Sequence, residues 1–342
     1  METCLIITSH FFDLPSNRTR KHVLNLILQF IHTNFTQNFR GKPSYLRLES
    51  YDDKGKDMKY GINIPNFGQF GDINTLVEIG SEVEDAGWDG FFIWDHLLVF
   101  KQEDMVLPFA DPWIALTAIA CNTKRIRLGP LVTPLPRRRP WKVAREALSL
   151  DHISKGRLTL GVGIGAPPEI EFEYFGEESD ARVRAQKLDE SLDILTGLWS
   201  GEPFSYNGNH YHLETMTFLP KPKQTPRIPI WVGGSVPFKA PFRRASRYDG
   251  VAPVHSKWPQ PITTKHLQKI LQIVQSERGN LNNYDVVVCG ETSGVDSHKD
   301  TERVTPWIDS GANWWLEDIN DLRAEIVVLR DRIRAGPPTV EI

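Results

Sequence analysis

This sequence of 342 residues has few cysteines, no long apolar run and little net charge. Its three cysteines, Cys4, Cys121 and Cys289, lie far apart and form no CxxC pair. We therefore expect neither a disulfide framework nor a metal site, and reduced thiols as in a cytoplasmic protein. The longest apolar stretch, residues 23–31, is interrupted by polar residues and is too short to span a membrane, which takes about 20 residues. The formal net charge of −3 gives no reason to expect nucleic acid or an anionic membrane as a partner.

Several catalytic motifs are absent as well. The chain has no nucleophile elbow, Walker loop or HExxH pair. The run Gly161-Val162-Gly163-Ile164-Gly165 superficially resembles a dinucleotide fingerprint. It lacks a third glycine at the required offset, and prolines follow it at once, so we reject that interpretation.

The first 57 residues differ from the rest of the chain. No acidic residue occurs between Asp13 and Glu49, as in some organellar transit peptides, but a secretory cleavage site is missing. Met58 then opens a well-patterned strand. We expect the domain at residues 58–342 and treat residues 1–57 as an N-terminal extension outside it. Three interpretations of this extension are open. Its start codon is assigned too far upstream, or it is a genuine disordered or targeting segment, or it contains a small capping helix near residues 21–31.

Short apolar runs and helix-like stretches alternate through residues 58–342. The first four runs recur about every 32 residues, which is typical of parallel strands joined by helical crossovers. Eight strands are expected, at residues 62–64, 91–94, 126–132, 158–162, 230–232, 250–254, 286–289 and 312–316. The pattern predicts an α/β fold, a (β/α)8 TIM barrel.

The interval between strands four and five is about twice the usual length, which predicts an insertion there. It contains an amphipathic stretch at residues 181–199 and two short strand-like runs around Asn207-Gly208, a sequence that favours a type I′ hairpin turn. We expect the insertion to lie on the loop face and help to cover the pocket.

Active sites of such barrels lie at the carboxyl ends of the strands, where Asp95-His96 follows strand two. Imidazole titrates near neutral pH, so His96 is the strongest catalytic candidate. Asp95 could orient it or contact a ligand, although neighbours on a strand point to opposite faces. Other residues expected at strand ends are Asn63, Pro65, Asn66, Phe67, Trp94, Thr133, Gly163, Gly165, Gly233, Gly234, Ser235, His255 and Glu317.

Two glycine-rich strand ends suit close approach of a ligand. Glycines at 163 and 165 let a ring or phosphate reach the backbone, and Gly233-Gly234-Ser235 offers N–H groups and a hydroxyl for a phosphate, or forms a tight turn. Arg137-Arg138-Arg139 could hold a cofactor tail or a subunit partner, or form a solvated loop. The acidic run at residues 169–178 is interpreted as solvated surface.

The chain resembles the luciferase-like family of flavin-dependent oxidoreductases over about residues 58–338. The resemblance rests on Trp94-Asp95-His96, on 125–129 leading into Thr133-Pro134, on 150–158, on 229–235 and on Tyr248-Asp249-Gly250. It implies a TIM barrel that binds FMN or a deazaflavin. It also implies that Pro65 and Thr133 approach the flavin ring and that His96 serves the substrate. The residues implied to flank the flavin phosphate are Gly163, Gly165, Ala166, Gly233, Gly234 and Ser235.

Related monooxygenases receive reduced FMN from a separate flavin reductase, and the flavin then reacts with dioxygen and a small organic substrate. We take such a monooxygenase as the main hypothesis. The alternative on the same barrel is a deazaflavin-dependent dehydrogenase or reductase that transfers hydride. A different class is a non-catalytic flavin-binding protein, or a hydrolase using Asp95 and Glu317. Pairing of two barrels into a homodimer, through helices such as 141–150, is compatible with the sequence.

Overall fold

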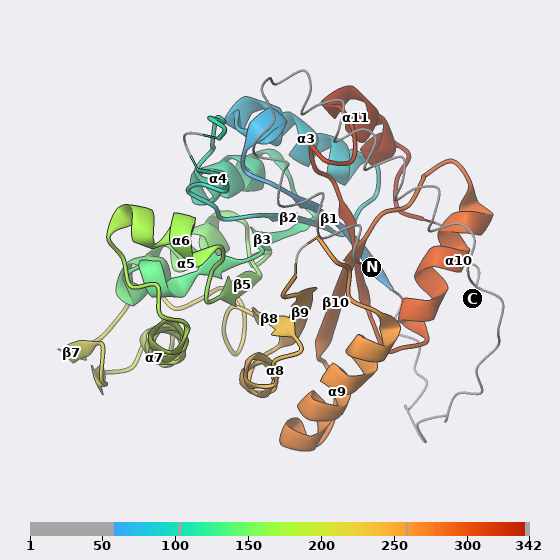
Figure 1. Ribbon diagram of the computed structural model, residues 1–342. Coiled ribbons are helices and arrows are strands. Elements are labelled where there is room, and N and C mark those ends of the chain that lie inside the picture. Colours follow the sequence, from blue (N-terminus) through green and yellow to red (C-terminus); the bar gives the residue numbers. More distant parts are fainter. Residues whose placement is uncertain (1–57, 102–103, 258, 339–342) are drawn as a thin grey trace. The chain divides into compact units, whose positions relative to one another are not determined.

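The computed structural model describes residues 58–101, 104–257 and 259–338 (Figure 1). The three interpretations of residues 1–57 therefore fall outside the described residues. Among the helices that the structure does describe, none is both long and apolar enough to cross a membrane.

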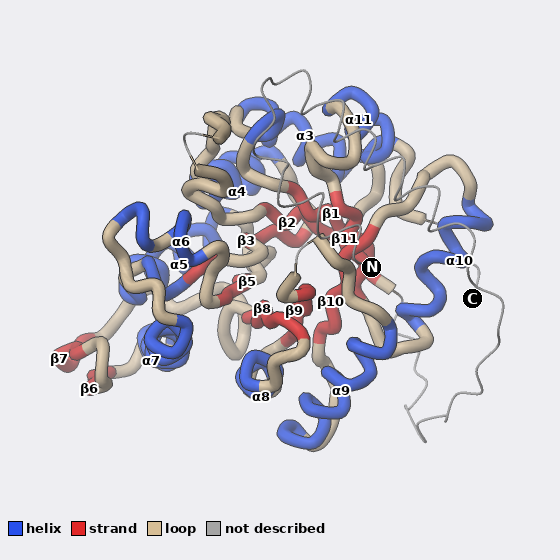
Figure 2. Tube along the Cα trace, in the orientation of Figure 1, coloured by secondary structure: helices blue, strands red, loops and turns tan. Residues whose placement is uncertain are grey.

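The described chain forms a nearly closed parallel barrel (Figures 1 and 2). The neighbouring strands follow the order β3-β2-β1-β11-β10-β9-β8-β5-β4. Because β3 and β4 are two halves of one barrel strand, broken at Leu131-Val132, this order begins and ends on the same strand. β3 pairs with β2, and β4 pairs with β5, so the (β/α)8 prediction is confirmed. The strands are β1 (Lys59–Ile64), β2 (Gly90–Ile93), β3 (Arg127–Pro130), β4 (Thr133–Pro134), β5 (Leu160–Gly163), β8 (Ile230–Val236), β9 (Gly250–His255), β10 (Asp285–Gly290) and β11 (Trp314–Asp318).

Helices alternate with these strands and pack on the outside of the barrel (Figure 2). Five of the listed helices, α3, α4, α7, α9 and α10, begin with a side-chain cap. The Asp111 carboxylate, for example, accepts hydrogen bonds from the N–H groups of Trp113 and Ile114 at 2.9 Å. The helices are α3 (Ile73–Asp85), α4 (Pro112–Asn122), α5 (Pro140–Ile153), α7 (Ala181–Trp199), α8 (Ala240–Ala245), α9 (Thr264–Arg278), α10 (Ser297–Ile308) and α11 (Ile326–Arg334), with the short α6 (Pro168–Glu171) before α7.

Aromatic rings fill the interior of the barrel. The ring of Phe92 stacks on Trp231 with centroids 4.7 Å apart, and Trp314 meets both rings edge-on. Leu131 and Cys289 are only partly buried and pack over this cluster. Side chains alternate along a strand, so the residues two positions after Phe92 and Leu316, namely Trp94 and Asp318, face the same interior. We call this end of the barrel the barrel mouth; its inward residues are Asn63, Trp94, His96, Gly163, Gly233, Cys289 and Asp318.

The insertion contains the expected helix, α7, and an antiparallel hairpin of β6 (Phe204–Asn207) and β7 (His212–Met216). The predicted position of the insertion is wrong in part. The strands of the hairpin pack beside α7, where Phe204 fills the space beside Gly197, and β7 lies beyond α7 from the barrel (Figure 1). The hairpin loop lines a pocket through His210 and Tyr211, together with Arg137 and Arg138. Residues 164–180, which include α6, bring Glu171 to His96.

The predicted two-residue turn of this hairpin is also wrong. Asn207 ends β6, and the loop spans residues 208–211. The buried Glu190 carboxylate of α7 accepts hydrogen bonds from the backbone N–H groups of Asn209, His210 and Tyr211. These three bonds stabilise the wider loop, so a tertiary contact overrides the local turn preference.

Candidate active site

His96 and Glu171 form the central contact of the barrel mouth. Nδ1 of His96 lies 2.9 Å from Oε1 of Glu171, which is only 1% exposed. The same oxygen accepts hydrogen bonds from the N–H groups of Leu97 and Leu98. A carboxylate only accepts, so this contact assigns the hydrogen to Nδ1 and leaves Nε2 of a neutral imidazole as an acceptor.

The surroundings keep His96 neutral at physiological pH. Burial and, to a lesser extent, the nearby Arg137 lower the pKa of His96 to about 4, although Asp95 opposes them. The side chain of His96 is still 24% exposed. His96 is therefore a reachable hydrogen-bond acceptor that resists taking up a full positive charge.

Asp95 lies on the other side of the strand end, between two arginines. Its Oδ1 accepts from Nη2 of Arg137 at 2.8 Å, and Oδ2 lies 3.0 Å from Nη2 of Arg138. The Thr133 hydroxyl also donates to Oδ2 at 2.8 Å. Arg137 reaches Glu171 as well, so the link from Asp95 to His96 runs through Arg137 and Glu171.

Two interpretations of charged runs are therefore wrong in part: they fail at Arg137, Arg138 and Glu171, whereas Arg139 and the other four glutamates are exposed. Arg137 and Arg138 are neither a solvated loop nor free for a cofactor tail, because Asp95 binds both. Glu171 is buried, although its acidic neighbours in the sequence made the whole run look like solvated surface. Nothing local in the sequence distinguishes Glu171, because its partners His96 and Arg137 come from other parts of the chain.

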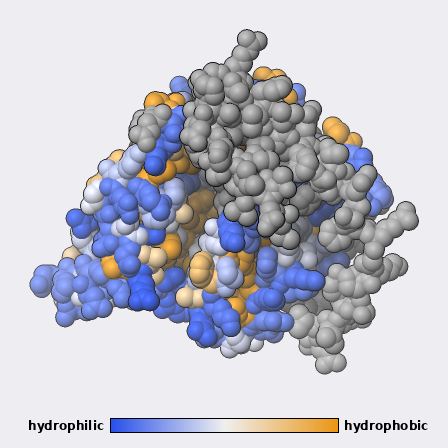
Figure 3. All heavy atoms as spheres, in the orientation of Figure 1, coloured by the Kyte–Doolittle hydropathy of each residue, from blue (hydrophilic) through white to orange (hydrophobic). Residues whose placement is uncertain are grey.

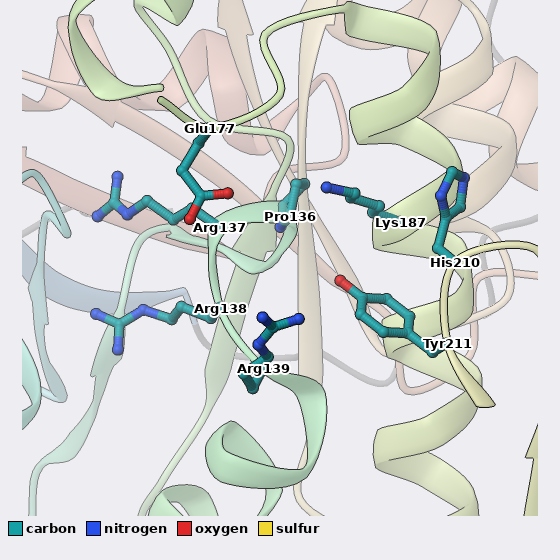
Figure 4. A pocket seen from close by; sticks show the side chains of 8 residues that line it. All are labelled: Pro136, Arg137, Arg138, Arg139, Glu177, Lys187, His210 and Tyr211. Atoms are coloured by element: carbon teal, nitrogen blue, oxygen red, sulfur yellow. The ribbon is translucent and has the colours of Figure 1, made fainter. Parts of the chain in front are cut away.

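All three arginines line a pocket of about 160 Å³, together with Lys187 and Tyr211 among others, but their side chains point in different directions. In Figure 4 the side chains of Arg137 and Arg138 extend together to one side of this pocket. Arg139 instead turns toward Tyr211 (Figure 4). The run of three arginines thus divides between the Asp95 ion pairs and the surface.

A second polar chain crosses the ends of three neighbouring strands. Trp94 Nε1 donates to Asn63 Oδ1 at 2.9 Å, and Asn63 Nδ2 donates to Asp318 Oδ1 at 2.8 Å. Burial raises the pKa of Asp318 to about 7; the Asn63 hydrogen bond opposes this shift, while Glu291 and Glu317 add to it. Sequence reasoning missed Asp318, although strand alternation from Trp314 and Leu316 could have found it.

Glu317, which was named instead, faces away from the barrel interior. It is fully buried and accepts hydrogen bonds from Thr292, Trp315 and Arg323. Arg332 lies within 3.4 Å of the same carboxylate. These partners satisfy Glu317 and hold the loop after β10, so a hydrolase built on Asp95 and Glu317 would have both carboxylates neutralised by arginines.

Aromatic residues form one wall of the barrel mouth. The rings of Phe67, Trp94 and His96 lie with centroids 5.8–6.1 Å apart, and Phe109 lies 5.3 Å from Phe67. Asn66 fixes this wall, because its amide donates to the carbonyl of His96 and accepts from the N–H of His96. On the part of the surface shown in colour in Figure 3, apolar residues gather toward the middle of the face.

The predicted glycines line the opposite side of the barrel mouth. A Cβ at Gly163 would lie 2.8 Å from the Val132 side chain, and a Cβ at Gly233 would lie 3.0 Å from it, so packing against Val132 favours glycine at both positions. Gly165 has φ +81°, and Gly234 packs tightly against α8. These contacts explain the glycines without a ligand, and their cofactor role stays a prediction.

One feature of β8 is not explained by packing. Its pairing with β5 ends at Val232, whereas its pairing with β9 continues to Val236. Within the described chain, the backbone of Gly233–Ser235 thus has no strand neighbour on the β5 side. Gly233 and Ser235 are partly exposed there. The arrangement leaves main-chain N–H groups and a hydroxyl beside the end of β5.

The family model described as luciferase-like monooxygenase matches residues 58–305. This chain belongs to the luciferase-like monooxygenase family. The recognition made from the strand-end motifs is confirmed. The match covers the barrel from β1 into α10, and it includes His96, Glu171 and the glycine strand ends.

Among curated relatives of this luciferase-like chain is the F420-dependent glucose-6-phosphate dehydrogenase of Microbacterium testaceum (strain StLB037). It is 34% identical over 202 residues, which are 58% of this chain and 57% of that protein. The chain thus spans less than two thirds of that relative's length.

Solved structures with the same fold include an F420-dependent secondary alcohol dehydrogenase in complex with an F420-acetone adduct. Its TM-score is 0.69 at 16% identity, covering 84% of this chain and 100% of that chain. The oxygenating constituent of 3,6-diketocamphane monooxygenase from Pseudomonas putida, in complex with FMN, gives a TM-score of 0.63 at 16% identity. It covers 82% of this chain and 96% of that chain.

Pro65 and Thr133 complete the predicted site residues of this luciferase-like barrel. Both are buried, and the Thr133 hydroxyl is engaged by Asp95 and by the indole N–H of Trp113. Their contact with a flavin ring stays a prediction. His96 and the glycine strand ends lie at the same end of the barrel, on facing walls. Among the described residues, no group of three or more His, Cys, Asp or Glu side chains could hold a metal ion.

Proposed function

We propose that this protein is a deazaflavin-dependent oxidoreductase that transfers hydride between its coenzyme and a small organic substrate with a hydroxyl or carbonyl group. The observation that carries the proposal is the neutral His96, held by Glu171 with Nε2 open to the barrel mouth. A free imidazole acceptor suits a substrate hydroxyl that must be oriented before its carbon loses hydride. The similarity to a curated F420-dependent dehydrogenase supports this choice over the monooxygenase hypothesis.

The residues of the barrel mouth are compatible with a flavin-type coenzyme. The unpaired edge of β8 at Gly233–Ser235 offers N–H groups and a hydroxyl to an anionic phosphate. Gly163 ends β5 beside this edge, and Gly165 and Ala166 follow it. We propose these residues for the phosphate, and Pro65 and Thr133 for the neighbourhood of the ring. When bound, a deazaflavin supplies an acceptor or donor of two electrons as hydride.

The protein residues then have separate tasks. Glu171 fixes the tautomer and the orientation of His96, and Arg137 holds Glu171 in place. His96 accepts a hydrogen bond from the substrate hydroxyl. The aromatic wall of Phe67 and Trp94 excludes water from the reacting atoms.

Binding and oxygen-uptake measurements on the full chain test the proposal. We expect F420 to bind more tightly than FMN, and an alcohol or sugar substrate to reduce F420 without oxygen uptake. Glucose 6-phosphate is the first substrate to try, because the curated relative is named for it. Oxygen uptake with FMN that a separate reductase has reduced, together with no binding of F420, would overturn the proposal.

An FMN-dependent monooxygenase is the second candidate. The description of the matching family model favours it, since that description names a monooxygenase. In that reaction, Nε2 of His96 could donate a hydrogen bond to a substrate carbonyl only after the imidazole is protonated. The low pKa of His96 disfavours this protonation. The oxygen-uptake arm of the experiment decides between the two candidates.

A further inference from the structure

We propose that Asp318 is a catalytic residue that takes up the hydroxyl proton of the substrate when the substrate is oxidised, and that Asn63 and Trp94 position it. This inference rests on the proposed function, because it assigns a proton acceptor to that reaction. In the bound substrate the single hydroxyl proton would be shared between Nε2 of His96 and Oδ2 of Asp318 in a bifurcated hydrogen bond. Asp318 would keep this proton when the O–H bond breaks, and His96 would only orient the hydroxyl.

The position of Asp318 in the barrel carries the inference. It ends β11 on the same face as Trp314 and Leu316, which belong to the apolar interior, so it stands above that interior at the barrel mouth. It pairs in register with Asn63 of β1, which donates to its Oδ1. No hydrogen bond from a described residue reaches its second oxygen, Oδ2. That oxygen is therefore available to a ligand in the barrel mouth.

The connection to His96 runs through the aromatic wall. Trp94 donates to Asn63 through its indole N–H, and its ring lies 5.8 Å from the imidazole of His96. The hydrogen bonds from Trp94 to Asn63 and from Asn63 to Asp318 thus fix Asp318 relative to the aromatic wall that carries His96. His96 follows β2 and Asp318 ends β11, and β1, which carries Asn63, lies between these two strands.

The charges around Asp318 differ from those around Asp95. Asp95 binds two guanidinium groups, whereas the nearest cation to Asp318, Arg323, donates to the Glu317 carboxylate at 2.7 Å and only to the main-chain carbonyl of Asp318. The titratable groups near Asp318 are Glu291 and Cys289 on the β10 side and Glu317 and Arg323 on its own side. Asp318 therefore has two carboxylates nearby, and no described residue forms a side-chain ion pair with it.

These surroundings suit a group that exchanges protons at neutral pH. Burial and the neighbouring carboxylates raise the pKa of Asp318 to about 7, whereas burial lowers the pKa of His96 to about 4. A general base works best when its pKa lies near the working pH. His96 would give up a proton again at once, and Asp318 would keep it for long enough to complete the reaction.

With a deazaflavin bound, the substrate carbinol carbon would lose a hydride to it, the O–H bond would break, and the electron pair of that bond would form the second bond of a carbonyl. The proton would go to Oδ2 of Asp318, which would become a neutral carboxylic acid. The substrate would be oxidised by two electrons, and the coenzyme would take up both of them. Asp318 then releases the proton to solvent, or delivers it to a carbonyl in the reverse reaction.

The test compares the pH profiles of wild type, Asp318→Asn and Glu291→Gln in F420 reduction by an alcohol substrate. For wild type, kcat/KM should rise with pH up to about 7, because only ionised Asp318 accepts the proton. Asp318→Asn should lower kcat by about 10²–10⁴-fold and abolish this rising limb of the pH profile, with the Kd of F420 unchanged. Glu291→Gln removes a carboxylate that raises the pKa of Asp318, so its limb should shift to lower pH with full activity on the plateau.

The outcomes separate this inference from the proposed function. A wild type that reduces F420 while Asp318→Asn keeps the same kcat and pH limb would overturn the inference and leave the function standing. A wild type that binds no F420 and oxidises no hydroxyl substrate would overturn both. If Asp318→Asn does not fold, an unshifted limb in Glu291→Gln would overturn the inference by itself, and a shifted limb would support it.

Discussion

Oε1 of Glu171 lies 2.9 Å from Nδ1 of His96, although the two residues are 75 positions apart in the sequence. Glu171 belongs to the segment between β5 and α7, and His96 follows β2. The contact therefore exists only when the insertion closes over the second strand end. It fixes which imidazole nitrogen faces the barrel mouth, and several predictions depend on it.

Removing the imidazole should affect turnover more than coenzyme binding. We expect His96→Ala to lower kcat by about 10²–10⁴-fold, because the substrate hydroxyl loses its acceptor, while the Kd of the coenzyme stays within about twofold. Steady-state kinetics and coenzyme titration measure the two quantities. His298→Ala, on the exposed face of α10, is the matched control and should behave as wild type. Equal loss of activity in both variants would contradict the assignment.

Neutralising Asp95 should destabilise the fold. Its carboxylate lies between Arg137 and Arg138, so Asp95→Ala leaves buried guanidinium groups without their partner. We expect the free energy of unfolding to fall by about 3–5 kcal/mol, as for other broken buried ion pairs. Urea unfolding at pH 7 measures it, with the exposed Asp309→Ala as the control. A loss below about 1 kcal/mol would mean that Asp95 does not hold the two arginines.

Stability should depend on pH through two opposing groups. Folding lowers the pKa of His96 from 6.5 to about 4, so the unfolded chain binds the extra proton and stability falls as the pH drops through this range. Folding raises the pKa of Asp318 from 3.8 to about 7, so the folded chain binds the extra proton and stability falls as the pH rises through that range. Between pH 4 and 6.5 the two contributions oppose each other.

Single substitutions should expose each contribution. Relative to wild type, unfolding free energies of Asp318→Asn should rise from pH 4.5 to 6.5, and those of His96→Asn should fall. Urea denaturation at the two pH values measures both slopes. Parallel slopes in the two variants would mean that one of the pKa directions is wrong.

The edge of β8 should recognise the phosphate of the coenzyme. Ser235→Ala should weaken binding of a phosphorylated deazaflavin by about tenfold, in the range of a lost hydrogen bond to a charged group, and leave the unphosphorylated ring compound unaffected. Fluorescence titration with both compounds measures the difference. Ser256→Ala, on an exposed position after β9, is the control. Equal weakening for the two ligands would argue against a phosphate site at Gly233–Ser235.

The proposed domain boundary can be tested by truncation. A protein that starts at Met58 should unfold at the same urea concentration as the full chain and bind the coenzyme with the same Kd, because β1 begins at Lys59. Circular dichroism and coenzyme titration measure both properties. Loss of folding on truncation would show that residues 1–57 belong to the domain.

The fold could be predicted because its signals are local. The eight strands are short apolar runs, which are typical of buried strands. Asp111-Pro112 marks a helix N-terminus, because the Asp111 carboxylate accepts a hydrogen bond from the N–H of Ile114, three residues later. The strand-end rule also led to His96. The hairpin was misplaced for the opposite reason, since Glu190 and Gly197 of α7 decide its turn and its position.

By itself, the sequence determined an alternating barrel, its strand ends and the Asp95-His96 pair, because strand periodicity and capping depend on neighbours along the chain. Only the tertiary structure decided that Arg137 and Arg138 turn inward to Asp95, that Glu171 holds His96, and that Asp318 rather than Glu317 faces the barrel mouth. Each of those outcomes depends on burial and on partners from distant segments. The free energy of a charged side chain depends on which charges surround it after folding, and the order of residues along the chain does not specify that.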